Sequence, residues 1–347
     1  MSAPARLSRP QAAKLDRARQ RQASRGQACR KTLLRLGTVK PATLRAYQNH
    51  VERFEAWCKK TGRTLRSLAD ADENLTEYMS HRYLQGEQPA DGRYTRFGYI
   101  LLRTSLDGDR AHQLPLSRKA LQGWSALSPG RSRDPLPHVV VHQIAGFLLQ
   151  RGELDAAMAV EVQFDTYARP SEILALTTAD VVGPQPHAGT IYAKDWCVNL
   201  ANSSTGKTRK NGECDDSVRL GVGDRAWLRS VFAKYYQKKQ PRHALFDLPL
   251  WRYERLFRMA TEQLKLASLK PCPHALRHSG PSHDRWQDFL SLGDVQKRGG
   301  WKAIKSCHRY EKHSTILKQV NKLGHAQQQQ AAAAARSIHL LFQKALR

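Results

Sequence analysis

Residues 273–278 read Pro-His-Ala-Leu-Arg-His, a pattern typical of the first turn of a helix. Pro273 suits the first helical position, because its missing N–H would have no partner there. His274 and Arg277 stand three residues apart, so their side chains share one face of that turn. A helix start also binds phosphate well, since its unpaired N–H groups and its dipole point outward. The stretch therefore predicts a helix that presents a histidine and an arginine to an anion.

Two further short motifs flank this predicted helix. Upstream, Arg169 directly precedes Pro170 and stands three residues before Glu172, which can support both the arginine and a helix start. Downstream, Trp301 stands nine residues before Tyr310. Taken singly, these patterns also fit a surface arginine before a capped helix and an amphipathic surface tyrosine. Their order along one chain is far more specific than any one of them.

In this order the motifs resemble the catalytic domain of the tyrosine recombinase, or phage integrase, family. That family carries an Arg with a Glu three residues later, a hairpin Lys, the pattern H-x-x-R, a His or Trp, and a Tyr nine residues further on. The intervals here are 105 residues from Arg169 to His274 and 33 residues from Arg277 to Tyr310. The pattern Pro-x-Thr-x-x-x-Tyr at 41–47 resembles the family's core-binding domain, so the resemblance covers residues 38–320.

The resemblance implies a role for each motif residue. Tyr310 would be the nucleophile and would form a 3′-phosphotyrosyl bond with DNA. Arg169 and Arg277 would hold two non-bridging phosphate oxygens with their planar, forked donors. His274 would take or orient the proton of Tyr310, whose ordinary pKa of about 10 makes it a weak nucleophile. Trp301 would donate its indole N–H to a phosphate oxygen.

The same resemblance places a lysine and a supporting acid. Glu172 would steady the first arginine without reacting itself. The family's hairpin lysine falls within 204–213, where Lys207 is the favoured acid for the 5′-hydroxyl leaving group and Lys210 is the alternative. The basic residues expected to contact DNA are Lys210, Arg209 and Arg45.

The activity that the resemblance implies is site-specific recombination or integration of double-stranded DNA, by strand breakage and rejoining. It needs no metal, no other cofactor and no ATP, because the phosphotyrosyl bond retains the energy of the broken linkage. The family implies a homotetramer on two DNA sites. Two alternatives are a type IB topoisomerase, which relaxes DNA with the same tyrosine chemistry, and a DNA-binding derivative of an integrase that no longer cuts.

Three positions depart from the usual family pattern. Pro281 is expected to shorten the helix that begins at Pro273. Arg298 stands where many relatives carry an apolar residue, and Pro170 replaces a common apolar residue after the first arginine. None of these changes removes a reacting group.

The charge of the chain indicates a polyanionic partner. The 347 residues include 57 Lys and Arg against 30 Asp and Glu, a formal net charge of +27. Residues 1–36 alone carry ten basic side chains and one acid, 10 − 1 = +9. This arm is either a tail, a DNA-tracking segment or a targeting segment.

Composition also bears on where the protein works. No apolar run approaches the roughly 18 residues of a membrane span, so no membrane partner is expected. The six cysteines show no zinc-binding spacing, no metal site is expected, and scattered reduced thiols are the simplest interpretation. The expected location is intracellular and DNA-associated, in a nucleus or a nucleoid.

The expected fold is mostly α with a small β-sheet or hairpin, in two domains. Apolar residues at steps of three and four between Leu44 and Cys58 predict one helix face in an all-α domain. Short strands are expected at 190–193 and 217–220, and the apolar end of the tail at 336–346 should pack on its own domain or on a neighbouring protomer. The expected divisions are a basic disordered arm (1–37), a helical core-binding, SAM-like domain (38–127), a Pro-rich linker (128–137), an α+β catalytic domain (138–320) and a Gln/Ala-rich tail with a helix (321–347).

Overall fold

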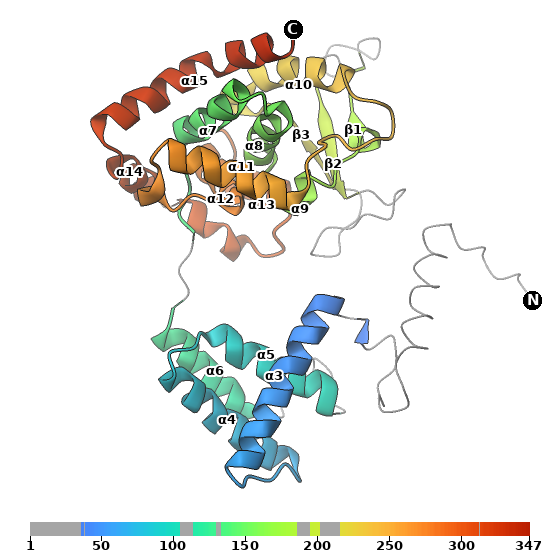
Figure 1. Cartoon of the computed structure of the whole chain (residues 1–347), viewed down its shortest axis with the longest axis vertical. Coiled ribbons are helices and arrows are strands. Elements are labelled where there is room, and N and C mark those ends of the chain that lie inside the picture. The colour runs from blue at the N-terminus through green and yellow to red at the C-terminus, as the bar shows by residue number, and fades with distance from the viewer. Residues whose placement is uncertain are drawn as a thin grey trace, which may run out of the picture. The chain divides into compact units, whose positions relative to one another are not determined.

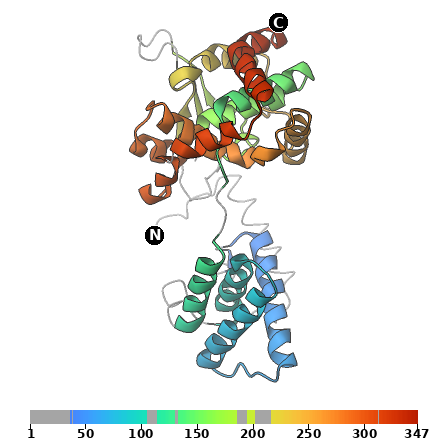
Figure 2. The same cartoon turned by 90° about the vertical axis from the view of Figure 1, so that its left-hand side faces the viewer.

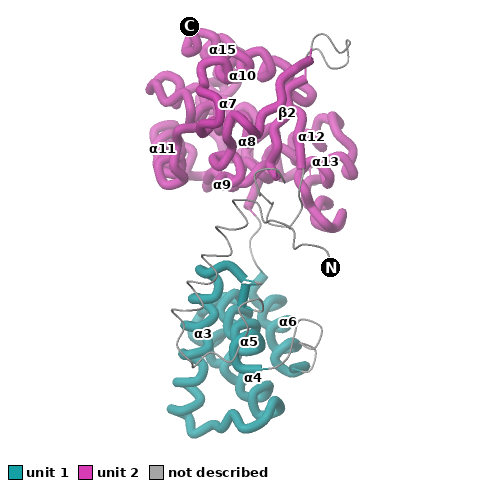
Figure 3. The backbone as a smooth tube through the Cα atoms, turned by 90° about the vertical axis from the view of Figure 1, so that its right-hand side faces the viewer, with its two compact units in different colours: residues 1–132 teal, residues 133–347 magenta. Residues whose placement is uncertain are grey.

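The computed structural model describes residues 36–37, 39–104, 114–129, 133–185, 195–201, 216–311 and 313–347. The chain divides into two compact units, Met1–Ser132 and Arg133–Arg347, coloured separately in Figure 3. The candidate hairpin residues Lys207, Arg209 and Lys210 lie outside the described residues.

The described part of the first unit is a bundle of four helices (Figure 2). Proline occupies the first turn of three of them, where its fixed φ suits a helix start. The second begins with a capping box, in which Ser67 and Asp70 satisfy each other's backbone N–H groups. Val51, Phe54 and Cys58 are buried from the first helix, as the apolar spacing predicts. The helices are α3 (Pro41–Lys60), α4 (Leu68–Leu84), α5 (Pro89–Arg103) and α6 (Pro115–Leu127).

Helices also make up most of the second unit, and they surround two buried ones (Figure 1). The central pair is α7 (His138–Gln150) and α8 (Leu154–Thr166); from Ala156 to Thr166 every residue of α8 is buried. The remaining helices are α9 (Pro170–Ile173), α10 (Trp227–Gln237), α11 (Leu250–Gln263), α12 (Pro273–Trp286), α13 (Leu292–Gly299), α14 (His313–Asn321) and α15 (His325–Ala345).

A small antiparallel sheet completes this unit, with strands β1 (Val181–Val182), β2 (Cys197–Ala201) and β3 (Asp216–Arg219) in that order. Val198 pairs with Val181 on one side and Val218 on the other. The expected strand at 217–220 corresponds to β3, β2 was not expected, and 190–193 lies outside the described residues. The prediction of a mostly helical chain with a small sheet is confirmed.

The C-terminal helix α15 packs on its own unit. It lies against α7 and α10 (Figure 1). It buries Ile338 and Phe342 in the core, whereas Leu340 is 56% exposed. Of the two alternatives for the apolar tail, the structure shows folding back on its own domain.

Pro281 does not shorten the helix that begins at Pro273, so that expectation is wrong. Helix α12 continues through Pro281 to Trp286. A proline removes one backbone hydrogen bond, but side-chain contacts hold the second half of α12 in place. Asp284, one turn beyond Pro281, forms ion pairs with the buried Arg225.

None of the helices in the described ranges combines the length and apolar content that crossing a membrane requires. The described cysteines Cys58, Cys197, Cys272 and Cys307 are free thiols.

Candidate active site

Tyr310 lies in a small buried cluster that packs against α12. It belongs to a short 3-10 helix, His308–Glu311, and is 3% exposed. Its ring lies 5.1 Å from that of Trp301, measured between centroids. Val295 and Cys307 pack in the same cluster. The predicted nucleophile and the predicted tryptophan therefore belong to one packed cluster.

The hydroxyl of Tyr310 meets His278 rather than His274. The oxygen lies 3.1 Å from Nδ1 of His278. His274 stands one helical turn earlier, with its ring 5.7 Å from the ring of His278. The structure thus brings to the hydroxyl a histidine that the sequence motifs did not single out. The signal was present, because residues four apart on a helix share a face.

Burial lowers the pKa of His278 and raises that of Tyr310, whereas nearby positive charges lower both. Burial, then the adjacent His274 and Arg309, lowers the pKa of His278 to about 4, so this ring is neutral at neutral pH. Burial raises the pKa of Tyr310, while the charges of Arg277 and Arg309 act to lower it. The neutral ring can accept a hydrogen bond from the phenol, and the charges of Arg277 and Arg309 favour loss of the phenol proton.

The side chain of Arg277 is fixed by two hydrogen bonds and by stacking against the ring of Trp301. Its Nη1 donates to the carbonyl of Tyr167 at 2.5 Å, and its Nη2 donates to the carbonyl of Gly299 at 2.9 Å. The guanidinium carbon lies 4.6 Å from the centroid of the Trp301 ring, within cation–π range. The side chain is only 3% exposed, so its charge acts in a site of low dielectric.

Arg169 and Glu172 form the pair that their spacing predicts. Arg169 precedes α9, and its backbone N–H donates to Glu172 Oε2 at 2.9 Å. Its guanidinium forms an ion pair with the other oxygen of the same carboxylate. Glu172 Oε2 also lies 3.9 Å from Nη1 of Arg277. One carboxylate therefore positions both arginines, and Arg169 remains 25% exposed at its side chain.

Two glycines make the close packing around the site possible. A Cβ on Gly299 would lie 1.7 Å from Cζ3 of Trp301, so a larger residue would push the indole away. A Cβ on Gly280 would lie 2.1 Å from the carbonyl oxygen of Phe164, where α12 crosses the end of α8. The absence of a side chain at these two positions therefore lets Trp301 pack against Gly299 and lets α12 pack against the end of α8.

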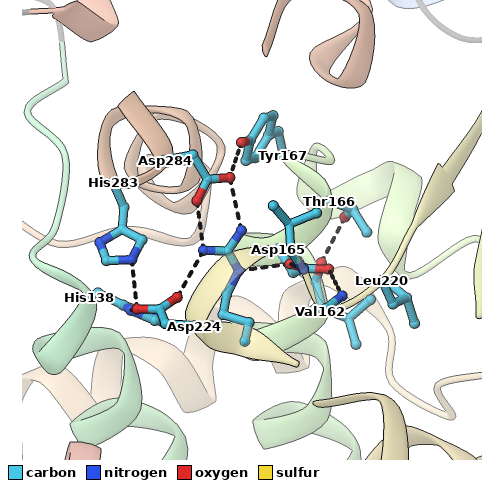
Figure 4. Close-up of polar contacts among 12 residues, drawn as sticks. His138, Val162, Asp165, Thr166, Tyr167, Leu220, Asp224, His283 and Asp284 are labelled. Atoms are coloured by element: carbon cyan, nitrogen blue, oxygen red, sulfur yellow. Dashed lines mark hydrogen bonds and ion pairs between the residues drawn. The ribbon is translucent and has the colours of Figure 1, made fainter. Parts of the chain in front are cut away.

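A buried charge network supports the backbone that holds Arg277 (Figure 4). Arg225 Nε donates to Asp165 Oδ1 at 2.7 Å, and its two Nη atoms donate to Asp284 at 2.7 and 2.8 Å. The Tyr167 hydroxyl donates to the same Asp284. Since the Tyr167 carbonyl accepts from Arg277, the network continues directly into the candidate site.

Arg298 also belongs to this network. Its Nε and Nη2 donate to the carbonyl of Asp165 at 2.9 and 2.7 Å, and Nη2 lies 3.2 Å from the Asp165 carboxylate. These hydrogen bonds from Arg298 therefore connect α13 to the C-terminal end of α8. The loop that carries Trp301 follows directly after α13.

The structure brings together most of the residues that the motifs predict. The ring of Trp301 lies between Tyr310 and Arg277 in the chain of contacts, because it packs against both. Glu172 connects Arg277 to Arg169. Arg45, a predicted DNA contact, is exposed on α3 in the first unit.

Comparisons with known proteins give fold likeness at low identity. No family model and no curated protein matches the chain. The crystal structure of XerA recombinase is similar at 13% identity and a TM-score of 0.38, over 79% of this chain and 98% of that one. The Tn1549 transposon integrase in complex with circular intermediate DNA is similar at 12% identity and a TM-score of 0.46, over 81% and 99%. The same integrase with transposon right-end DNA gives 11% and 0.41, over 81% and 98%. Because these values are low, the function proposed below depends on the residues of this chain.

Proposed function

We propose that this chain breaks and rejoins double-stranded DNA through a covalent bond between Tyr310 and a 3′-phosphate, as a tyrosine recombinase. The observation that carries the proposal is the position of the Tyr310 hydroxyl. It lies 3.1 Å from a neutral histidine and next to a buried arginine and a tryptophan. This combination suits a phenol that must lose its proton beside an anionic phosphate.

In the proposed step the Tyr310 oxygen attacks phosphorus as its proton passes to His278. A bond forms between phosphorus and the phenolic oxygen, and the bond to the 5′ oxygen of the next nucleotide breaks. The leaving oxygen takes a proton from the hairpin lysine, for which Lys207 is preferred to Lys210. Attack by another 5′-hydroxyl reverses these transfers and frees the tyrosine, so no ATP is consumed.

The arginines would stabilise the charge that grows on the phosphate. Arg169, which is partly exposed and paired with Glu172, would contact a phosphate oxygen. Arg277 contributes a positive charge that lowers the pKa of Tyr310 against the effect of burial. Trp301 stacks over the guanidinium of Arg277. His274, half-buried on the same face as His278, would orient the phosphate or the second ring.

The proposed partner is double-stranded DNA. The net charge of +27 provides phosphate contacts, and Arg45, Arg209 and Lys210 are proposed among them. Exchange of strands between two duplexes requires four cuts, so we propose a homotetramer on two DNA sites. The biological setting would be recombination or integration of a mobile element in a nucleoid or a nucleus.

A trapping assay tests the proposal directly. Full-length protein is mixed with nicked duplexes from a library of candidate sites, and covalent adducts are resolved on a denaturing gel. We expect an adduct that Tyr310→Phe abolishes. The matched control is Tyr236→Phe, which removes a hydroxyl bonded to the Thr178 carbonyl elsewhere in the same unit and should leave the adduct unchanged.

The other outcomes identify the alternatives. Binding of duplex without any adduct across the library would favour a non-catalytic DNA-binding derivative. An adduct together with relaxation of supercoiled plasmid, but no strand exchange between two sites, would favour a type IB topoisomerase.

A further inference from the structure

Two histidines and a glutamate gather in the core of the second unit, away from the Tyr310 pocket. His138 and His142 stand four residues apart on α7, so both rings lie on one face of that helix. Glu161 comes from α8, which packs against α7. One nitrogen from each ring and one carboxylate oxygen all lie within 4.8 Å of one another.

The carboxylate of Glu161 is unusually deeply buried for an acidic side chain. Glu161 is 1% exposed and His142 is 5% exposed. The Oε1 atom of Glu161 lies 2.9 Å from Nδ1 of His142, but its Oε2 atom is buried with no hydrogen-bond partner. An unsatisfied oxygen on a buried carboxylate is strongly destabilising unless something compensates it.

His138 has the second unsatisfied atom. Its Nδ1 lies 3.4 Å from Oδ2 of Asp224, while its Nε2 is buried without a partner. A metal-bound histidine ordinarily has this arrangement, in which one ring nitrogen faces a carboxylate and the other is available to the ion. The buried unpartnered atoms thus belong to two of the three residues that could bind the same ion.

We propose that His138, His142 and Glu161 bind a divalent transition-metal ion, with Zn²⁺ as the first candidate. Imidazole nitrogens and a carboxylate oxygen suit Zn²⁺ better than Mg²⁺ or Ca²⁺, which prefer oxygen ligands. Zinc donors lie about 2.0–2.2 Å from the ion, so small side-chain rotations would bring donors now within 4.8 Å onto it. The ion would compensate the Glu161 charge and link α7 to α8.

A second histidine group nearby is a weaker candidate. Asp224 lies 3.0 Å from Nε2 of His283 and also faces His138. These three residues could also gather around an ion, but their carboxylate is 42% exposed and already bonded to both rings. We therefore assign Asp224 to orienting His138, and Figure 4 shows it between His138 and His283.

The proposed ion would act on structure rather than on DNA chemistry. Asp224 is followed by Arg225, the centre of the buried network that reaches Tyr167 and the carbonyl holding Arg277. The metal would therefore fix the start of the second unit and one end of that network. This proposal does not depend on the proposed recombinase activity, and its test involves no DNA.

The experiment uses the full chain after removal of metal with a chelator. Co²⁺, which reports its coordination by visible absorption, is titrated in and then displaced with Zn²⁺. We expect one Co²⁺ per chain with bands of a nitrogen and oxygen site, and a rise of the thermal midpoint of the second unit with Zn²⁺. A wild-type chain that binds neither ion with one-to-one stoichiometry would overturn the proposal.

Variants locate the ion. Glu161→Gln keeps the shape of the side chain and removes the unsatisfied charge, so the apo protein should fold, which circular dichroism verifies; it should lose the Co²⁺ spectrum. Asp224→Asn should weaken Zn²⁺ binding about 10- to 100-fold, as expected for a residue that orients a ligand. The control is His325→Gln, at an exposed histidine on α15, which should bind as the wild type does.

A further variant protects the test against misfolding. If Glu161→Gln does not fold, His142→Gln is used in the same titration and should lose the spectrum. Retention of one tight Co²⁺ site in a folded variant of either residue would place the ion elsewhere and refute the assignment.

Discussion

The Tyr310 hydroxyl lies 3.1 Å from Nδ1 of His278, the histidine that directly follows Arg277, and not against His274. The two histidines are one turn apart on α12, so both face the same pocket. The one that touches the phenol is the more deeply buried and is kept neutral by burial and by its cationic neighbours. In the proposed reaction, His278 is therefore the residue that would take the proton of the phenol.

Replacing His278 should slow cleavage more than replacing His274. Loss of a positioned proton acceptor commonly costs about 100- to 10,000-fold in rate, and we expect His278→Gln to slow adduct formation by at least about 100-fold. Single-turnover trapping at neutral pH measures both variants. A larger loss for His274→Gln than for His278→Gln would contradict the assignment.

The depressed pKa of His278 predicts a loss of stability in mild acid. The unfolded chain binds a proton as pH falls below the ordinary value of 6.5, whereas the folded chain resists until about pH 4. The stability that the neutral His278 ring contributes to the folded state is therefore fully present above pH 6.5 and is lost as the pH falls toward 4. Between pH 7 and pH 5 we expect His278→Gln to lose about 2 kcal/mol less unfolding free energy than the wild type. Urea unfolding of both proteins at the two pH values measures this difference, and equal losses would show that His278 titrates normally.

Asp165 should be essential for the stability of the second unit. Its carboxylate is fully buried and compensates both Arg225 and Arg298. Asp165→Asn would leave two buried guanidinium groups undercompensated, and we expect a cost of about 3–5 kcal/mol in unfolding free energy. Denaturant melts measure it against Asp195→Asn, which breaks a partly exposed pair with Arg219 and should cost under about 1 kcal/mol. Similar losses of unfolding free energy in the two variants would show that the buried Asp165 network is not essential for the stability of the second unit.

The buried face of α15 predicts that its apolar residues stabilise the monomer. Phe342 is fully buried and packs near Trp227 of α10. Phe342→Ala should lower unfolding free energy by about 3–5 kcal/mol, whereas Leu340→Ala, at a side chain 56% exposed, should change it by less than about 0.5 kcal/mol. Thermal melts combined with sedimentation test this. A change in oligomeric state for Phe342→Ala without loss of stability would show that the helix packs between protomers.

Local spacing in the sequence determined several residues of the candidate site and the helices that carry them. Pro273 predicted the start of α12, and the three-residue step from Arg169 to Glu172 predicted an ion pair that the structure contains. Such relations involve neighbours on one turn, where backbone geometry alone fixes which side chains share a face. The apolar steps of α3 are predictable for the same reason.

Long-range contacts were decided only by the tertiary structure. The choice of His278 over His274 depends on where the loop after α13 places Tyr310, a position 32 residues away in the chain. Pro281 stays helical because Asp284 reaches Arg225, and Glu161 meets His142 only because α7 and α8 pack together. Helical periodicity specifies which face of an element is polar or apolar, but the partner of that face is selected by packing between elements distant in sequence.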